Sequence, residues 1–249
     1  MNKNKWLFLS GLSRDKRYWL DFPEKFKKKF NVEIINEDLP GFGTYESIRT
    51  PTNVEKNAQL VKKSIKSKAE GSPINIIAFS FGAMVAMEIA RSKKIIVKNL
   101  ILINTSSRHT KWHKRLKPEA CLLCASFPLK KSDQREEKLY DLTTKINKQN
   151  NLLKNKFVNL STEQKSSPLN AIKQLIAATK YKAPEKLGKH TKPYIIVSKQ
   201  DNFTDQSCSK HLANHFQAPL FINHKSGHDI ILDDPNWLLT TCEKIINEF

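Results

Sequence analysis

Cysteine and glycine are scarce in this chain, and long apolar runs are missing from it. Four cysteines among 249 residues are too few for a dense disulfide framework, which favours a reduced, cytoplasmic setting. The apolar run that follows the basic residues 1–5 is too short for a secretion signal. No run approaches the roughly 18 apolar residues that cross a bilayer, so we expect a soluble cytoplasmic protein without a membrane span.

Cys121 and Cys124 have C-x-x-C spacing, which in other contexts marks a redox or metal site. Here the pair lies in an apolar stretch, and no second cysteine pair accompanies it. Unreactive cysteines behave as small apolar side chains. We therefore expect both to occupy buried helix positions, and we expect no bound metal.

Acidic residues are also few, because 24 Asp and Glu stand against 43 Lys and Arg, a net charge of +19. The excess is largest in residues 107–190, which hold 19 basic and 7 acidic side chains. A basic surface attracts nucleic acid, acidic carrier proteins or anionic lipid. The abundance of Lys, Asn and Ile fits a purely compositional origin equally well. No helix-turn-helix, zinc or RNA-recognition motif is present, so we expect no nucleic-acid binding.

Six short apolar runs have the length and the β-branched or aromatic content of strands. Several are apolar on both faces, as parallel strands that are covered by helices on both sides must be. The predicted strands are residues 5–10, 32–36, 74–78, 99–104, 194–198 and 219–223.

Amphipathic helical patterns separate these runs, and the alternation predicts an α/β fold with a mostly parallel, doubly wound sheet. The predicted helices are residues 16–30, 53–68, 82–92, 204–216 and 235–248. The alternation stops between residues 107 and 190, where only helical patterns occur. They lie near residues 115–126, 132–148, 150–158 and 168–180. This segment is too long for a loop, so we interpret 107–190 as a helical cap on a core of 1–106 and 191–249.

Ser80 lies in a small-x-Ser-x-Gly turn that joins the strand at 74–78 to a helix with small residues on one side. This strand–turn–helix context is typical of a nucleophile elbow. Such a turn lifts the serine above the carboxyl edge of the sheet and directs the Phe81 N–H and the helix N-terminus at the reacting oxygen. A buried serine in a tight turn is the structural alternative.

A serine nucleophile needs a base, and the base needs an acid that orients it. His228 follows the last predicted strand, and Asp201 follows the strand at 194–198. Both positions place side chains at the carboxyl edge of the sheet. Asp205 is the rival acid, but we expect it inside the next helix. The chain order Ser80, Asp201, His228 is the one expected for this arrangement.

The loop after the first strand should supply the second oxyanion donor. Gly11 allows close approach of the backbone, and the N–H of Leu12 is the predicted donor beside that of Phe81.

Taken together, these motifs resemble the α/β-hydrolase superfamily over the whole chain. They are most similar to the small capped bacterial esterases that include pimeloyl-acyl-carrier-protein methyl ester esterases. The DLPGFG turn at residues 38–43 is similar to the D-x-x-G-x-G turn of those enzymes. Ala78 stands where Gly is commoner, and Ser10 stands where many relatives have His, which leaves the bracing of the oxyanion loop open.

The resemblance implies a serine hydrolase that cleaves carboxylic esters through an acyl-enzyme, without a cofactor. A pimeloyl-acyl-carrier-protein methyl ester is one such substrate, which would imply a role in biotin biosynthesis and an acidic acyl carrier protein as partner. Phe79, Trp112 and Phe127 are the predicted substrate contacts. A thioesterase, another acyl hydrolase of this fold, or a non-catalytic binding protein on the same scaffold remain the alternatives.

Overall fold

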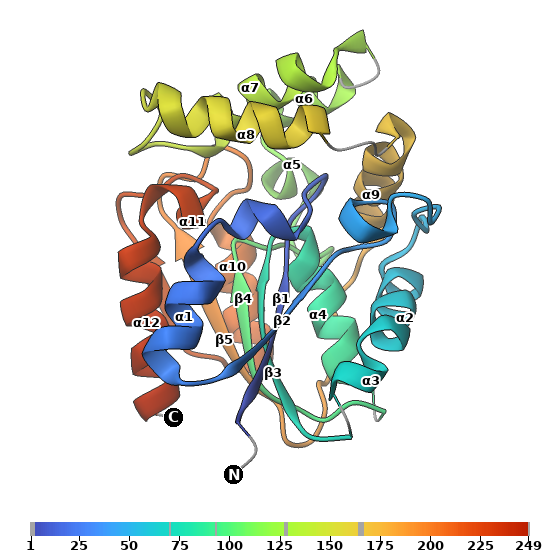
Figure 1. Ribbon diagram of the computed structural model, residues 1–249, viewed down its shortest axis with the longest axis vertical. Helices are drawn as coiled ribbons and strands as arrows, with labels where there is room; N and C mark the ends of the chain where they lie inside the picture. Colours follow the sequence, from blue (N-terminus) through green and yellow to red (C-terminus); the bar gives the residue numbers. More distant parts are fainter. Residues whose placement is uncertain (1–2, 70, 93, 127–128, 164–166, 249) are drawn as a thin grey trace.

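The computed structural model describes residues 3–69, 71–92, 94–126, 129–163 and 167–248. Within them, six strands form one sheet in the order β2–β1–β3–β4–β5–β6. Every neighbouring pair is parallel, so the predicted α/β architecture is confirmed and the sheet is parallel throughout (Figure 1). The strands are β1 (Lys5–Leu9), β2 (Glu33–Glu37), β3 (Ile74–Phe79), β4 (Val97–Ile103), β5 (Lys192–Ser198) and β6 (Leu220–Asn223).

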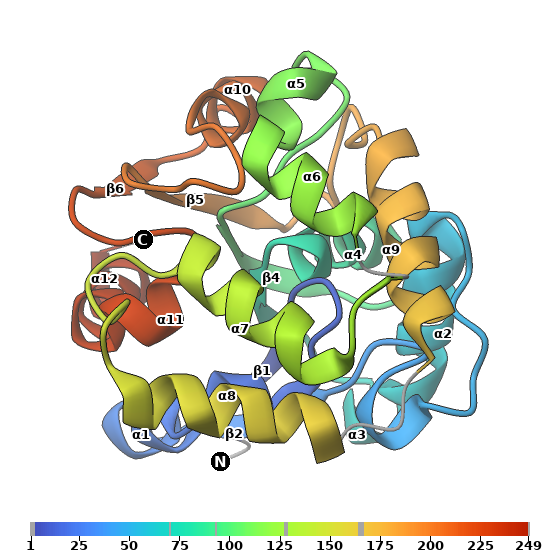
Figure 2. The same cartoon turned by 90° about the horizontal axis from the view of Figure 1, so that it is seen from above.

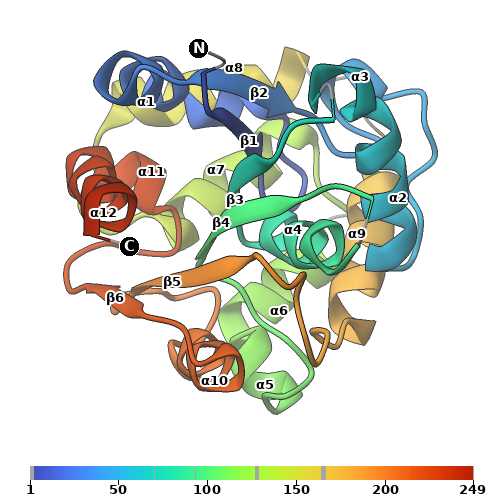
Figure 3. The ribbon, with the colours of Figure 1, turned by 90° about the horizontal axis from the view of Figure 1, so that it is seen from below.

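The central strands are apolar on both faces because each face packs against its own layer of helices. Successive side chains of a strand point to opposite faces. In β3, Ile76 and Ala78 pack toward α2 (Val54–Ser64) and α4 (Phe81–Arg91), whereas Ile77 and Phe79 pack toward α1 (Phe22–Phe30) and α12 (Pro235–Glu248). Figure 3 shows the two layers on either side of the sheet.

The other described helices outside the segment between β4 and β5 are η1 (Lys16–Trp19), η2 (Gly43–Tyr45), α3 (Lys66–Ala69), α10 (Ser207–Phe216) and α11 (Ile230–Asp233). The prediction that Asp205 lies inside a helix is wrong, because α10 begins two residues later. The Asp205 carboxylate instead accepts a hydrogen bond from the backbone N–H of Ser207 at 2.9 Å.

Between β4 and β5 the described chain forms helices and no strand. These inserted helices are α5 (Trp112–Arg115), α6 (Pro118–Ala125), α7 (Ser132–Thr143), α8 (Asn151–Glu163) and α9 (Pro168–Lys180). Three of them, α6, α7 and α8, lie above the carboxyl edge of the sheet (Figures 1 and 2). These three helices therefore cover the side chains and loops at the carboxyl ends of the strands.

Two expectations for this segment need correction. The helix predicted to reach residue 148 ends at Thr143, since the next N–H groups, those of Lys145, Ile146 and Asn147, donate to the Asp233 carboxylate instead of continuing the helix. Cys124 is buried as expected, but Cys121 is exposed. Among the described residues no helix is both long and apolar enough to span a bilayer.

Candidate active site

Ser80 occupies a strained turn between β3 and α4. Its backbone has φ 52° and ψ −114°, a conformation that costs a non-glycine residue on the order of 1–3 kcal/mol. The turn is held because the Ser80 N–H donates to the Ile103 carbonyl at 2.8 Å, and the Thr105 hydroxyl donates to the Ser80 carbonyl at 2.8 Å. Neighbouring strand ends thus fix the serine above the carboxyl edge of the sheet.

Gly82 explains why the motif needs a glycine two residues after the serine. A Cβ at this position would lie 2.3 Å from the Ser10 carbonyl oxygen and 2.7 Å from that of Leu9. Those distances are too short for any side chain. The first turn of α4 therefore packs directly on the loop after β1, which brings the N-terminus of α4 beside that loop.

Ser80, His228 and Asp201 form one hydrogen-bonded chain, although they come from different parts of the sequence. The His228 Nε2 lies 3.1 Å from the Ser80 Oγ, and the His228 Nδ1 lies 2.7 Å from an Asp201 carboxylate oxygen. The second Asp201 oxygen accepts from the N–H groups of Phe203 and Thr204 at 2.7 and 2.8 Å. The carboxylate is thus fixed on one side by backbone donors and on the other by the imidazole.

The imidazole of His228 is buried and contacts two aromatic rings. Its centroid lies 5.0 Å from that of Phe79 and 4.9 Å from that of Phe203. These contacts, together with the hydrogen bonds to Ser80 and Asp201, limit the movement of the ring. Phe79, which the sequence suggested as a substrate contact, packs under the histidine instead of lining the cavity next to Ser80, because it points to the α1 and α12 face of the sheet.

Two residues that the sequence analysis did not single out hold the histidine loop. The Asn104 amide donates to the His228 carbonyl at 2.6 Å and accepts from the Ser198 N–H at 2.8 Å, so it joins the ends of β4 and β5 to that loop. The Asp233 carboxylate accepts from the Gly227 N–H at 2.7 Å. Asn104 lies directly after a strand, and this position could have indicated from the sequence that its side chain lies at the site.

The loop after β1 lies beside Ser80, as expected, and side chains of α7 and α9 both contact it. The Gln174 side chain of α9 accepts a hydrogen bond from the Ser13 N–H at 2.8 Å. The Arg14 guanidinium forms a buried ion pair with Glu136 of α7. Ser10 contributes a hydrogen bond to the Asp15 carbonyl at 3.0 Å. The bracing that the sequence left open therefore comes in large part from the inserted helices.

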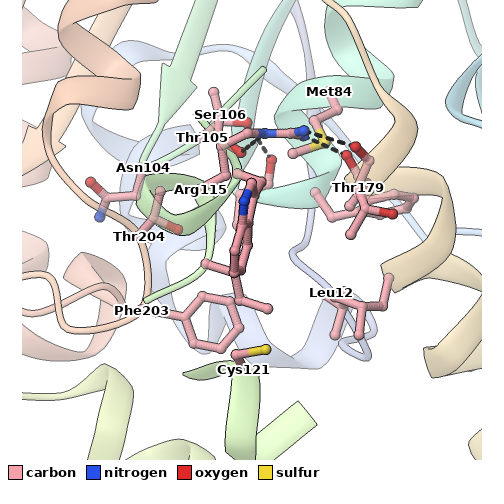
Figure 4. Close-up of a pocket in the computed structure, with 16 residues that line it drawn as sticks. Leu12, Met84, Asn104, Thr105, Ser106, Arg115, Cys121, Thr179, Phe203 and Thr204 are labelled. Atoms are coloured by element: carbon pink, nitrogen blue, oxygen red, sulfur yellow. Dashed lines mark hydrogen bonds between the residues drawn. The ribbon is translucent and has the colours of Figure 1, made fainter. Parts of the chain in front are cut away.

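A cavity of about 180 Å³ opens beside Ser80 (Figure 4). Leu12, Phe81 and Met84 line it from the core, and Trp112 and Leu175 line it from the inserted helices. Trp112 is 75% exposed, so it stands at the cavity mouth. The remaining predicted contact, Phe127, lies outside the described residues. The cavity is smaller than the roughly 300–1,000 Å³ of sites for drug-sized ligands, which suits a small organic group.

Asp229, next to the histidine, is a buried carboxyl group with an altered pKa. Burial is the largest cause and raises its pKa from 3.8 to about 6, although Arg14 and His228 lower it. The folded state therefore binds this proton more tightly than the unfolded state does. As a result, Asp229 is largely neutral in both states below about pH 4, and the fold loses stability as the pH rises from about 4 to about 6. Above that range the loss is constant, because Asp229 is ionised in both states.

Replacing Asp229 with asparagine should remove this penalty. Two pKa units correspond to about 3 kcal/mol, so we expect Asp229→Asn to raise the free energy of unfolding at pH 8 by up to about that amount and to have little effect at pH 4. Urea unfolding of both proteins at the two pH values measures the difference. Asp21→Asn, at an exposed carboxylate, is the control. An equal gain for Asp229→Asn at pH 4 and pH 8 would contradict the expectation.

Among the described residues, no group of three or more His, Cys, Asp and Glu side chains is arranged to hold a metal ion. The chemistry that this arrangement can perform is nucleophilic. A serine hydroxyl bonded to an imidazole, which is bonded to a fixed carboxylate, can transfer its proton and attack an electrophilic carbon.

A family model described as the alpha/beta hydrolase family matches residues 6–240. A search of curated proteins finds no significant match. The fold is similar to that of many solved structures, three of which are compared below.

A thermophilic esterase from Thermogutta terrifontis has a TM-score of 0.80 at 16% identity, covering 99% of this chain and 90% of its own. The esterase EaEST from Exiguobacterium antarcticum has a TM-score of 0.83 at 15% identity, covering 98% and 92%. An enol-lactonase from Burkholderia xenovorans LB400 has a TM-score of 0.80 at 13% identity, covering 99% and 93%. At these identities, the structural likeness concerns the fold.

Proposed function

This chain belongs to the alpha/beta hydrolase family, and from that premise we propose that it is a serine hydrolase of carboxylic esters with Ser80 as nucleophile, His228 as base and Asp201 as orienting acid. The observation that carries the proposal is the continuous hydrogen-bonded path from the Ser80 hydroxyl to the Asp201 carboxylate beside a cavity. The strained backbone of Ser80 supports it, because a serine with only a packing role has no need of that conformation.

The reaction follows from the geometry. His228 takes the proton of Ser80 as the hydroxyl oxygen attacks the acyl carbon, and the imidazolium is stabilised by Asp201. The imidazolium then protonates the leaving alcohol, which departs and leaves the acyl group on Ser80. Water, deprotonated by His228, releases the acid and restores the serine.

The oxyanion of each tetrahedral intermediate is assigned to the N–H groups of Leu12 and Phe81. Both residues line the cavity with Ser80. Phe81 is the first residue of α4, so its N–H has no acceptor within the helix. It lies at the helix N-terminus, where the helix dipole places partial positive charge. The hydrogen bond from Ser13 to Gln174 and the ion pair of Arg14 hold the loop that presents the Leu12 N–H.

The division of the chain into a hydrolase core and a helical cap of residues 107–190 is part of the proposal, because Trp112 and Leu175 of that segment line the cavity.

Thioesters fit the same chemistry. Docking of an acidic acyl carrier protein, and with it a pimeloyl ester substrate, stays a prediction for which the structure adds no support.

An activity-based probe tests the proposal directly. A fluorophosphonate should attach covalently to Ser80, because only a serine activated by a base attacks that reagent at a useful rate. Peptide mass spectrometry of the labelled protein identifies the modified residue. His228→Gln should lose labelling while keeping its folded circular dichroism spectrum. Absence of labelling at Ser80 in the folded wild-type protein would count against a hydrolase and favour a non-catalytic binding protein.

A further inference from the structure

One charged side chain lines the cavity beside Ser80. Of the sixteen described residues around that cavity, Arg115 is the single Asp, Glu, Lys or Arg. It ends α5, at the start of the inserted helices. The remaining lining is mainly apolar, with Leu12, Met84 and Leu175 among its members. Arg115 is partly buried, and the apolar part of its surroundings disfavours its charge.

The protein satisfies Arg115 only in part. Its guanidinium donates to the carbonyls of Thr179 at 2.8 Å and Ala178 at 2.5 Å, and its Nε lies 3.4 Å from the Ser106 hydroxyl (Figure 4). A guanidinium has five N–H donors. Two of them, one on each terminal nitrogen, thus have no acceptor among the described residues. The three acceptors hold the side chain in one orientation.

No acidic side chain balances this charge within the described part of the chain. The structure contains no ion pair of Arg115 there, and burial is the largest cause that lowers the pKa of its guanidinium. The two carbonyls belong to the last turn of α9, whose dipole supplies about half a negative charge. One role of Arg115 is therefore to hold the C-terminal turn of α9 in place. The helix dipole offsets only part of the charge of the guanidinium, so net positive charge remains at the cavity wall.

We propose that Arg115 forms a subsite for a carboxylate of the substrate, so that the preferred substrates are esters that also carry a free carboxylate group. The inference rests on the proposed function, because it names the substrate class of the same site. A carboxylate suits an unused N–H donor of this guanidinium, since hydrogen bonds between a guanidinium and a carboxylate are assisted by their opposite charges. The apolar lining then accommodates the carbon atoms between the carboxylate and the ester.

Matched pairs of esters test this substrate class. On the acyl side, the mono-4-nitrophenyl esters of succinate, glutarate and adipate are compared with neutral esters in which an isopropyl group replaces the carboxylate. On the alcohol side, 4-acetoxybenzoate is compared with 4-acetoxytoluene. In each case the uncatalysed rate is subtracted. The readout is the preference, defined as the ratio of kcat/KM for the charged ester to that for its neutral partner.

We expect the wild-type protein to prefer the charged ester at least tenfold in one of these series. Arg115→Met should lower that preference by about 10- to 100-fold, the effect of one hydrogen-bonded charge pair. Arg115→Lys should keep part of it, since the charge remains while the planar geometry is lost. Arg108→Gln removes an exposed charge near Arg115 but outside the cavity lining, and it should leave the preference unchanged.

Two results would overturn the subsite. One is a wild-type protein that hydrolyses the neutral esters equally well in every series, a comparison that requires no variant to fold. The other is an Arg115→Met protein that keeps the full preference. Neither result touches the proposed function, which fails separately if Ser80→Ala hydrolyses the neutral esters at the wild-type rate.

Discussion

Ser80→Ala should lower kcat for a neutral 4-nitrophenyl ester by at least about a thousandfold, because the proposed mechanism forms the acyl-enzyme on the Ser80 hydroxyl. The residual rate would come from the oxyanion donors and from substrate binding, which the substitution leaves in place. KM should change little for the same reason. Initial rates of nitrophenolate release over a range of ester concentrations give both constants.

The same position allows a second measurement that separates chemistry from folding. The φ of 52° at Ser80 strains alanine as it strains serine, so Ser80→Ala should unfold in urea close to the wild-type midpoint. Ser80→Gly should be equally inactive but more stable by about 1 kcal/mol, since glycine adopts this conformation without strain. An inactive Ser80→Ala protein that has also lost its fold would say nothing about the nucleophile. A Ser80→Ala protein that is folded and fully active would contradict the proposed role.

The second large effect is expected at the buried ion pair between Arg14 and Glu136. Both side chains are only 6% exposed. The guanidinium also lies over the rings of Tyr18 and Phe157, at 4.4 and 5.2 Å from their centroids. Burial lowers the pKa of Arg14, but the Glu136 carboxylate and its other neighbours raise it by more, so the arginine stays charged.

Removing one partner leaves a buried charge without its counter-ion. We therefore expect Glu136→Gln to lower the free energy of unfolding by about 3–5 kcal/mol. The double variant Arg14→Met with Glu136→Leu should recover much of that loss, because it removes both charges together. Urea unfolding of Arg14→Met, of Glu136→Leu and of the double variant gives the coupling free energy.

The chain offers a matched control for that cycle. Arg17 forms an ion pair with Glu163 of α8, which also joins the core to an inserted helix, but the Glu163 side chain is 62% exposed. Exposed pairs contribute roughly 0–1 kcal/mol, so Glu163→Gln should change stability little. If the buried and exposed pairs gave equal losses, burial would not be the reason for the large effect.

Much of the core and of the candidate site follows from local sequence patterns. The turn around Ser80 has the small-x-Ser-x-Gly motif between a strand and a helix, and both Asp201 and His228 lie within a few residues of a strand end, where parallel sheets collect side chains. Phe79 could also have been placed from its sequence. It lies two residues after Ile77 in the same strand, so alternation puts both on one face of the sheet.

Other features depend on contacts between distant segments, which periodicity does not record. The end of α7 at Thr143 is set by the Asp233 carboxylate, far along the chain. The roles of Gln174 and Arg115 depend on where α9 and α5 pack relative to the loop after β1 and to the cavity. In isolation these residues are ordinary members of polar helix surfaces, and only the assembled fold gives them their partners.

The hydroxyl of Ser80 and the imidazole of His228 are separated by 148 residues of chain, and the sheet between them is parallel throughout. Parallel strands can pair only after long connections have closed, which makes such folds slow to assemble. During synthesis, the nucleophile thus leaves the ribosome well before its base. Under the proposed mechanism, a nascent chain that ends before β6 carries an unactivated serine, and hydrolysis is expected only after the last strand has joined the sheet.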